Sequence, residues 1–202
     1  MYTPETRGAP WRLALCLVFV VGVLCFVAPG GVSAQEPNAE AVVVGSDGLV
    51  DEADISRHEF RNQLATMKDS VASGVVTYRY PLRATADFQD CNNCAYDVRI
   101  RYRDTGPNQR VVVRVKAALL TGDGVETVYT FDSNAVGAPP ASNLNQTFIG
   151  SFIAPFNHIT HGTYSYFLEV ELSKTANDNT QSPGFIGFAI SEVPVNGGPE
   201  PR

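Results

Sequence analysis

The feature that most constrains the fold is a strict alternation of apolar and polar residues from residue 75 onward. Residues 96–103 show it most clearly, with tyrosine, valine, isoleucine and tyrosine at the even positions and one aspartate and three arginines at the odd positions. Because successive side chains of a strand point to opposite faces, this pattern predicts a strand with one buried and one solvent-facing side. Similar segments, separated by turn or loop residues, occur at 75–84, 111–117, 125–131, 147–153, 163–173 and 184–191. These seven strands predict an all-β fold, a jelly-roll or immunoglobulin-like β-sandwich.

The segments 96–103 and 111–117 are predicted to form a β-hairpin, because only the turn at Asp104–Asn108 separates them. This hairpin would bring five cations to one polar sheet face: Arg99, Arg101, Arg103, Arg114 and Lys116. Neighbouring like charges repel unless they are neutralised. The face is therefore either a binding site for an anion, such as a sulfated or uronic-acid polysaccharide, or a ladder of cross-strand ion pairs with Glu169 and Glu171. We favour the ladder.

The first 34 residues have the layout of a secretory signal peptide. Arg7 and Arg12 precede an uncharged apolar run at 13–28, and small residues occupy positions 32–34. The run is short for a membrane span, although an N-terminal membrane anchor is the alternative. We expect residues 1–34 to be removed and the protein to be secreted, periplasmic or on the cell surface. No stable membrane insertion is expected after cleavage.

Residues 35–73 form an acidic segment with eight acidic and three basic residues. We expect an acidic linker followed by one short helix, because Ser56 and Glu59 have capping-box spacing and four apolar residues follow at helical spacing. Those four are Phe60, Leu64, Met67 and Val71. The helix is predicted to pack either against the sandwich, which is predicted at 74–192, or against another subunit. The Pro/Gly-rich residues 193–202 predict a disordered tail.

A short acidic stretch within this segment resembles the second half of a dockerin or EF-hand calcium loop. Asp47, Asp51 and Asp54 match carboxylate positions of the pattern, and a glycine at 48 matches its turn residue. The resemblance implies a calcium ion held by these three aspartates. Val43 and Gly45 depart from the pattern, since they occupy its first two ligand positions. The alternative is an acidic linker without a cofactor, and no other cofactor is predicted.

Cys91 and Cys94 are the two cysteines that remain outside the predicted signal peptide. In an exported protein they most simply form a disulfide with each other. A redox pair is the first alternative, although a strand follows where redox motifs have a helix. The second alternative is a zinc site completed by His158 and His161. Asn145 begins an Asn-Gln-Thr glycosylation sequon.

Composition and motifs also bound the function. A net charge of −6 argues against nucleic acid as a partner. The sequence has no nucleophile elbow, zinc-protease helix or phosphate loop, so we predict that the protein is not an enzyme. Two function classes remain. One is an extracellular binding module for a glycan or matrix component, and the other is a structural subunit joined to further copies through residues 35–73 or an edge strand.

Aromatic residues give little support for a sugar-stacking surface. The only tryptophan, Trp11, lies in the predicted signal peptide. Four tyrosines share the alternation phase of the aliphatic residues and are predicted to be core: Tyr96, Tyr102, Tyr164 and Tyr166. A sugar site in the loops could instead use Tyr80, Phe88 or Phe156.

Overall fold

The structure is a computed structural model, and it describes residues 41–82, 95–122, 124–153, 164–175 and 181–193. The chain divides into two units, residues 1–34 and 35–202, and all described residues belong to the second. They form eleven strands: β1 (Ala41–Val44), β2 (Leu49–Val50), β3 (His58–Arg61), β4 (Leu64–Met67), β5 (Gly74–Pro81), β6 (Ala95–Asp104), β7 (Gln109–Leu119), β8 (Val125–Asp132), β9 (Ser142–Ile153), β10 (Tyr164–Lys174) and β11 (Gly184–Val193). Two single-turn 3₁₀ helices, η1 (Gly45–Asp47) and η2 (Glu52–Asp54), lie between the first strands.

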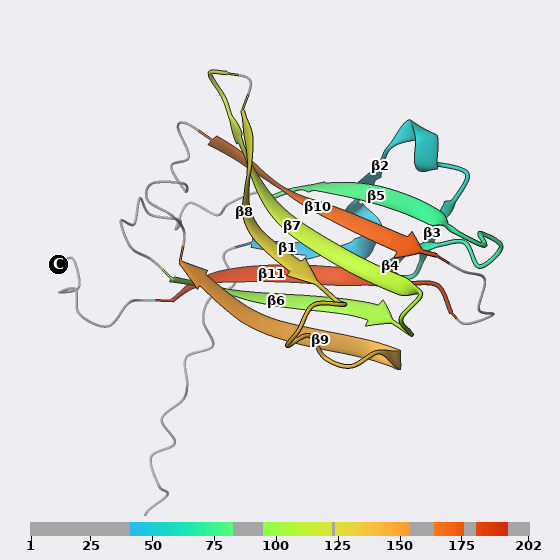
Figure 1. Cartoon of the computed structure of the whole chain (residues 1–202). Helices are drawn as coiled ribbons and strands as arrows, with labels where there is room; N and C mark the ends of the chain where they lie inside the picture. The colour runs from blue at the N-terminus through green and yellow to red at the C-terminus, as the bar shows by residue number, and fades with distance from the viewer. Residues whose placement is uncertain (1–40, 83–94, 123, 154–163, 176–180, 194–202) are drawn as a thin grey trace, which may run out of the picture. The chain divides into compact units, whose positions relative to one another are not determined.

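The strands form two antiparallel sheets that face each other (Figure 1). Sheet A has the order β3-β4-β11-β6-β9, and β1 pairs with β11 beside β4. Sheet B has the order β2-β5-β10-β7-β8. The all-β sandwich is therefore confirmed, and each of the seven strands predicted from residue 75 onward is present as β5 to β11.

Most of the alternating residues fill the space between the sheets, as predicted, but Tyr164 and Tyr166 are only half-buried. Tyr96 and Tyr102 of β6 are buried in this core, and their rings contact aromatic rings of β9 and β8, respectively. Two tyrosines of β5 tie sheet B to β4 and to η1 by hydrogen bonds as well as by packing. The Tyr78 hydroxyl donates to the Thr66 carbonyl at 2.9 Å, and the Tyr80 hydroxyl donates to the Gly45 carbonyl at 2.8 Å. Tyr80 is thus a core residue and cannot belong to a sugar-binding loop.

The predicted helix after Ser56 is wrong, because these residues form the β3–β4 hairpin. The turn is made by Asn62, whose φ of 58° is a left-handed conformation that asparagine tolerates. Ala65 and Thr66 then pair with the start of β11. The helical spacing of the apolar residues was misleading, since Met67 is fully buried while Phe60 is 40% exposed.

The predicted boundary at residue 74 is also wrong, because residues 41–73 are part of the sandwich and not a linker. β1 pairs with β11 over four residues, and β2 pairs with β5. At Gly45 the chain lies so close to β11 that a Cβ there would be 2.2 Å from the Phe185 carbonyl oxygen. This close approach explains why the position needs glycine.

The predicted hairpin of β6 and β7 does not form. β6 belongs to sheet A and β7 to sheet B, so their connection crosses from one sheet to the other. The buried Asp104 carboxylate fixes this crossing, because it accepts hydrogen bonds from the Ser133 hydroxyl and the Gly106 amide. Ser133 in turn accepts a hydrogen bond from the Val111 amide at the start of β7. Alternation showed which faces were apolar, but it could not show whether the two strands lie side by side or face to face.

Several predictions concern residues outside the described ranges: the signal peptide at 1–34, the disulfide of Cys91 and Cys94, the histidines His158 and His161, and the tail after Val193. Among the described residues, no helix has the length and hydropathy needed to cross a membrane.

Candidate binding face

The five cations predicted to share a face lie on the outer surfaces of two different sheets. Arg99, Arg101 and Arg103 are on β6 in sheet A, whereas Arg114 and Lys116 are on β7 in sheet B. The basic face as predicted therefore does not exist. The two groups also differ in their partners.

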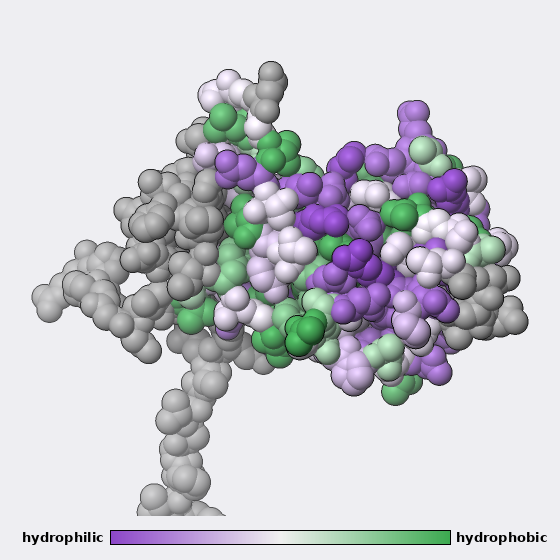
Figure 2. Space-filling view, in the orientation of Figure 1, coloured by the Kyte–Doolittle hydropathy of each residue, from purple (hydrophilic) through white to green (hydrophobic). Residues whose placement is uncertain are grey.

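The cations of sheet B form the predicted ladder of ion pairs. β10 lies beside β7 and places Glu169 directly opposite Arg114. The Arg114 guanidinium is 3.3 Å from Glu169 and 3.2 Å from Glu171, and the Lys116 ammonium is 3.3 Å from Glu169. Hydrophilic side chains accordingly gather over β7 and β10 in Figure 2. Because two cations meet two carboxylates, this face offers no unpaired charge to an anionic ligand.

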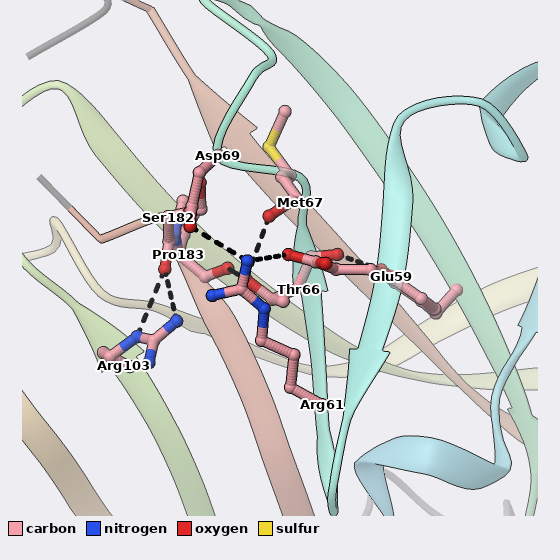
Figure 3. A network of polar contacts seen from close by, with 9 residues as sticks. Glu59, Arg61, Thr66, Met67, Asp69, Arg103, Ser182 and Pro183 are labelled. Atoms are coloured by element: carbon pink, nitrogen blue, oxygen red, sulfur yellow. Dashed lines mark hydrogen bonds and ion pairs between the residues drawn. The ribbon is translucent and has the colours of Figure 1, made fainter. Parts of the chain in front are cut away.

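Arg103 has a structural role at the far end of β6. Its guanidinium donates two hydrogen bonds, at 3.2 and 2.9 Å, to the Ser182 carbonyl just before β11 (Figure 3). The Ser182 hydroxyl donates to Asp69, which also pairs with Arg61 at 2.9 Å. Burial lowers the pKa of Arg103 from its ordinary value. These contacts hold the start of β11 and leave Arg103 unavailable to a ligand.

Arg99 and Arg101 are different, because both are exposed and neither forms a hydrogen bond or ion pair with another described residue. Every other arginine or lysine in the described part of the chain has such a partner: Arg57, Arg61, Lys68, Arg79, Arg103, Arg110, Arg114, Lys116 and Lys174. The two free guanidinium groups project from one strand two residues apart, about 7 Å along it.

A shallow groove of about 170 Å³ lies beside these arginines and runs along β11. The strand register explains its shape. On β11, Ala189 lies between Arg99 of β6 and Val42 of β1. Two residues away on the same outer face, Gly187 lies opposite Arg101. The small residues of β11 form a low floor, β1 forms an apolar wall, and the arginines form the other wall. Apart from the two arginines and Gln63, the lining is apolar.

A second hollow of about 340 Å³ lies between β8 and β9, beside the connection 135–138. Its aromatic residues contact one another. Phe131 and Phe148 have ring centroids 4.6 Å apart, and Tyr129 stacks on Phe152 at 5.0 Å. Because these contacts join the edges of the two sheets, the hollow is better explained as part of the packing than as a sugar-stacking site.

The three aspartates of the proposed calcium loop have separate partners. Asp51 pairs with Arg79 at 2.8 Å, Asp54 accepts a hydrogen bond from the Thr77 amide, and Asp47 accepts one from Ser46. Within the described ranges, no group of three or more histidines, cysteines, aspartates or glutamates is placed to hold a metal ion. The structure therefore does not bring these carboxylates together, and two of them tie the start of the domain to β5.

The sequon residue Asn145 lies exposed on β9, next to the irregular pairing at the start of that strand. Exposure is compatible with glycosylation, which stays a prediction.

Sequence reasoning found Arg99 and Arg101 but missed the groove beside them. The groove depends on β1 and β11 lying next to β6, which no local pattern indicates. Gly187 was the available signal, because a glycine inside a strand marks a close approach of another chain segment. A Cβ at Gly187 would lie 2.9 Å from the Val43 carbonyl oxygen.

The fold and this face define a two-sheet antiparallel sandwich with an exposed cationic groove. No protein-family model matches the chain, and no curated protein matches it.

Among solved structures, the chain is similar to a carbohydrate-binding module of Cellvibrio mixtus lichenase 5A in complex with cellotriose. The TM-score is 0.38 and the identity 10%, over 77% of this chain and 98% of that one. It is also similar to the C-terminal family 6 module of LamC from Zobellia galactanivorans, with TM-score 0.37 and 11% identity over 74% and 97% of the two chains. A third likeness is to infectious bursal disease virus, Gt strain, with TM-score 0.33 and 9% identity over 75% and 29%. All these TM-scores are below 0.5, too low for the likenesses to establish the fold or the function.

Proposed function

We propose that this protein is a non-catalytic binding module that takes an acidic glycan in the groove along β11. The observation that carries the proposal is the pair Arg99 and Arg101, the only two cations among the described residues that have no partner. Planar guanidinium groups donate paired hydrogen bonds to carboxylate and sulfate oxygens, which are the charged groups of uronic-acid and sulfated sugars.

The other lining residues support a sugar polymer as the ligand. Val42 and Ala189 offer apolar contact for the C–H faces of sugar rings, while the arginines meet the charged substituents. The groove is shallow and follows a strand, which suits a segment of an extended chain. Its lining contains no acid, histidine, cysteine or hydroxyl side chain, and this supports binding without catalysis.

The proposal includes export, because acidic polysaccharides are met mainly outside the cytoplasm. The support for export is the signal-peptide layout of residues 1–34. N-terminal sequencing of the protein recovered from its natural source tests this part, with cleavage after Ala34 as the expected result.

Calorimetric titration with oligogalacturonate and with a sulfated oligosaccharide tests the binding function. The double variant Arg99→Gln/Arg101→Gln should bind the acidic ligand about tenfold more weakly than the wild type, since each exposed pair contributes about 0.7 kcal/mol. The apolar groove and the fold remain, because both side chains project into solvent.

Arg79→Gln is the matched control. Arg79 is also an exposed strand arginine, but it lies in sheet B and pairs with Asp51. Its replacement should leave the affinity within twofold of the wild type. Equal losses in both variants, or no loss in the double variant, would contradict binding in this groove.

A further inference from the structure

The longest edge strand of the sandwich, β9, lacks the charges, the proline and the short length that usually prevent an exposed edge from pairing, and its one irregularity lies at its start. β9 ends sheet A, and no described strand pairs with its outer side. Its twelve residues include no charged residue and no proline. Soluble proteins normally protect such edges with charges, proline, bulges or short length.

The other edges of the two sheets show this protection. β2 has two residues, and β1 and β3 have four each, with Glu59 and Arg61 on β3. β8 has eight residues, but it carries Glu126 and Asp132, and its irregular pairing with β7 lies in the middle of the strand, whereas that of β9 lies at its start. Only β9 combines length with neutrality among the described edges.

From this contrast we infer that β9 pairs antiparallel with β9 of a second copy of the chain. Residues 146–153 keep an unbroken register with β6, so they present a regular eight-residue edge. When β9 pairs antiparallel with β9 of a second copy, the arrangement is two-fold symmetric and uses the same edge in both copies. Neither edge is then left for a third copy, so the assembly stops at a dimer. A neutral strand suits this arrangement, because a charge near the two-fold axis would face its own copy.

Exposed apolar side chains on β9 fit the same partner. Ile149 is 65% exposed and Leu144 is 75% exposed. Ile149 lies within the regular run, so in the dimer it packs against outward side chains of the second β9. The partner strand thus covers apolar surface as well as unpaired backbone groups.

The free arginines do not oppose this dimer. Arg99 and Arg101 lie one strand in from the edge, so three strand spacings, about 14 Å, separate them from their copies across the axis. This distance exceeds the Debye length of about 8 Å at physiological salt, so their repulsion is screened. The two grooves would lie on the same outer face of one continuous sheet.

Sedimentation velocity of the purified protein from about 5 µM to about 500 µM tests the inference. The wild type should show a concentration-dependent monomer–dimer equilibrium. Ile149→Lys places two ammonium groups near the axis and should weaken dimerisation at least tenfold. A thermal melt of each variant checks that it is folded.

Leu49→Lys is the matched control, since Leu49 is an apolar residue of another edge strand, β2, and is 70% exposed. It should dimerise like the wild type. The inference is overturned if the wild type stays monomeric at the highest concentration. It is also overturned if folded Ile149→Lys dimerises normally, or if Leu49→Lys loses the dimer instead. Glycan binding by a monomeric protein would leave the proposed function intact.

Discussion

Three arginines of β6 show how surroundings give one residue type different roles. Arg99, Arg101 and Arg103 are spaced two residues apart on β6 and therefore project from the same face. Arg103 lies where β11 begins and holds the Ser182 carbonyl, while the other two lie over the small residues Gly187 and Ala189. Their spacing predicted one common face but could not separate the structural arginine from the two free ones.

Asp104 leads to a prediction about pH at the same scale. Burial raises the pKa of this carboxyl above its ordinary value of 3.8, although the hydrogen bonds from Ser133 and Gly106 oppose the shift. Below pH 3.8 the group is protonated in both the folded and the unfolded protein. As the pH rises, the unfolded chain releases this proton first, so the contribution of Asp104 to stability falls until the pH passes the raised pKa. Asp104→Asn does not titrate. In urea denaturation, the free energy of unfolding of this variant should therefore rise relative to the wild type between pH 3 and pH 7.

Asp132→Asn provides a control with the opposite sign. The hydrogen bond from Arg110 is the main cause that lowers the pKa of Asp132. The stabilisation by Asp132 is therefore present above pH 3.8 and is lost as the pH falls through the lowered pKa. Relative to the wild type, this variant should lose stability as the pH rises. A difference for Asp104→Asn that stays flat or falls with pH would show that burial does not raise the pKa of this carboxyl.

At the scale of elements, strands with long alternating patterns were predictable and short ones were not. β6 and β7 each bury every second side chain over most of their length, so the local sequence determines them. β3 and β4 have four residues each and depend on pairing with β11, which lies more than 100 residues further along the chain. Pairing with a strand so distant in the sequence leaves no alternating pattern in the residues of β3 and β4. The helical spacing of their apolar residues therefore led to the wrong prediction of a helix.

Gly45 tests whether the first strands belong to the sandwich. Gly45→Ala should destabilise the protein by about 3 kcal/mol, because its Cβ would lie 2.2 Å from the Phe185 carbonyl oxygen and the backbone would have to move. If residue 45 lay in a detached linker, the same substitution would leave the free energy of unfolding unchanged. Gly124→Ala is the control, since a Cβ there meets nothing within 4 Å, and its effect should stay within about 0.5 kcal/mol. Equal stability of the two variants in thermal or urea unfolding would contradict the packing of η1 against β11.

At the scale of the whole molecule, total charge and local charge point in opposite directions. The chain has a net charge of −6, which excludes general attraction of anionic polymers. The charges on the outer face of β7 and β10 are paired, whereas the groove in sheet A carries two free cations. Within the described ranges, Arg99 and Arg101 are therefore the cations through which short-range contacts to an acidic glycan are proposed.

This origin of the affinity predicts a specific dependence on salt. Raising the salt from about 0.15 M to 1 M shortens the Debye length from about 8 Å to 3 Å and screens exposed ion pairs. The wild-type affinity for oligogalacturonate should then fall by about threefold to tenfold, as measured by calorimetry. The weaker binding left in Arg99→Gln/Arg101→Gln should change little, because only apolar and neutral polar contacts remain in the groove. If the double variant kept the full salt dependence, the attraction would come from other cations, and the groove along β11 would not be the site.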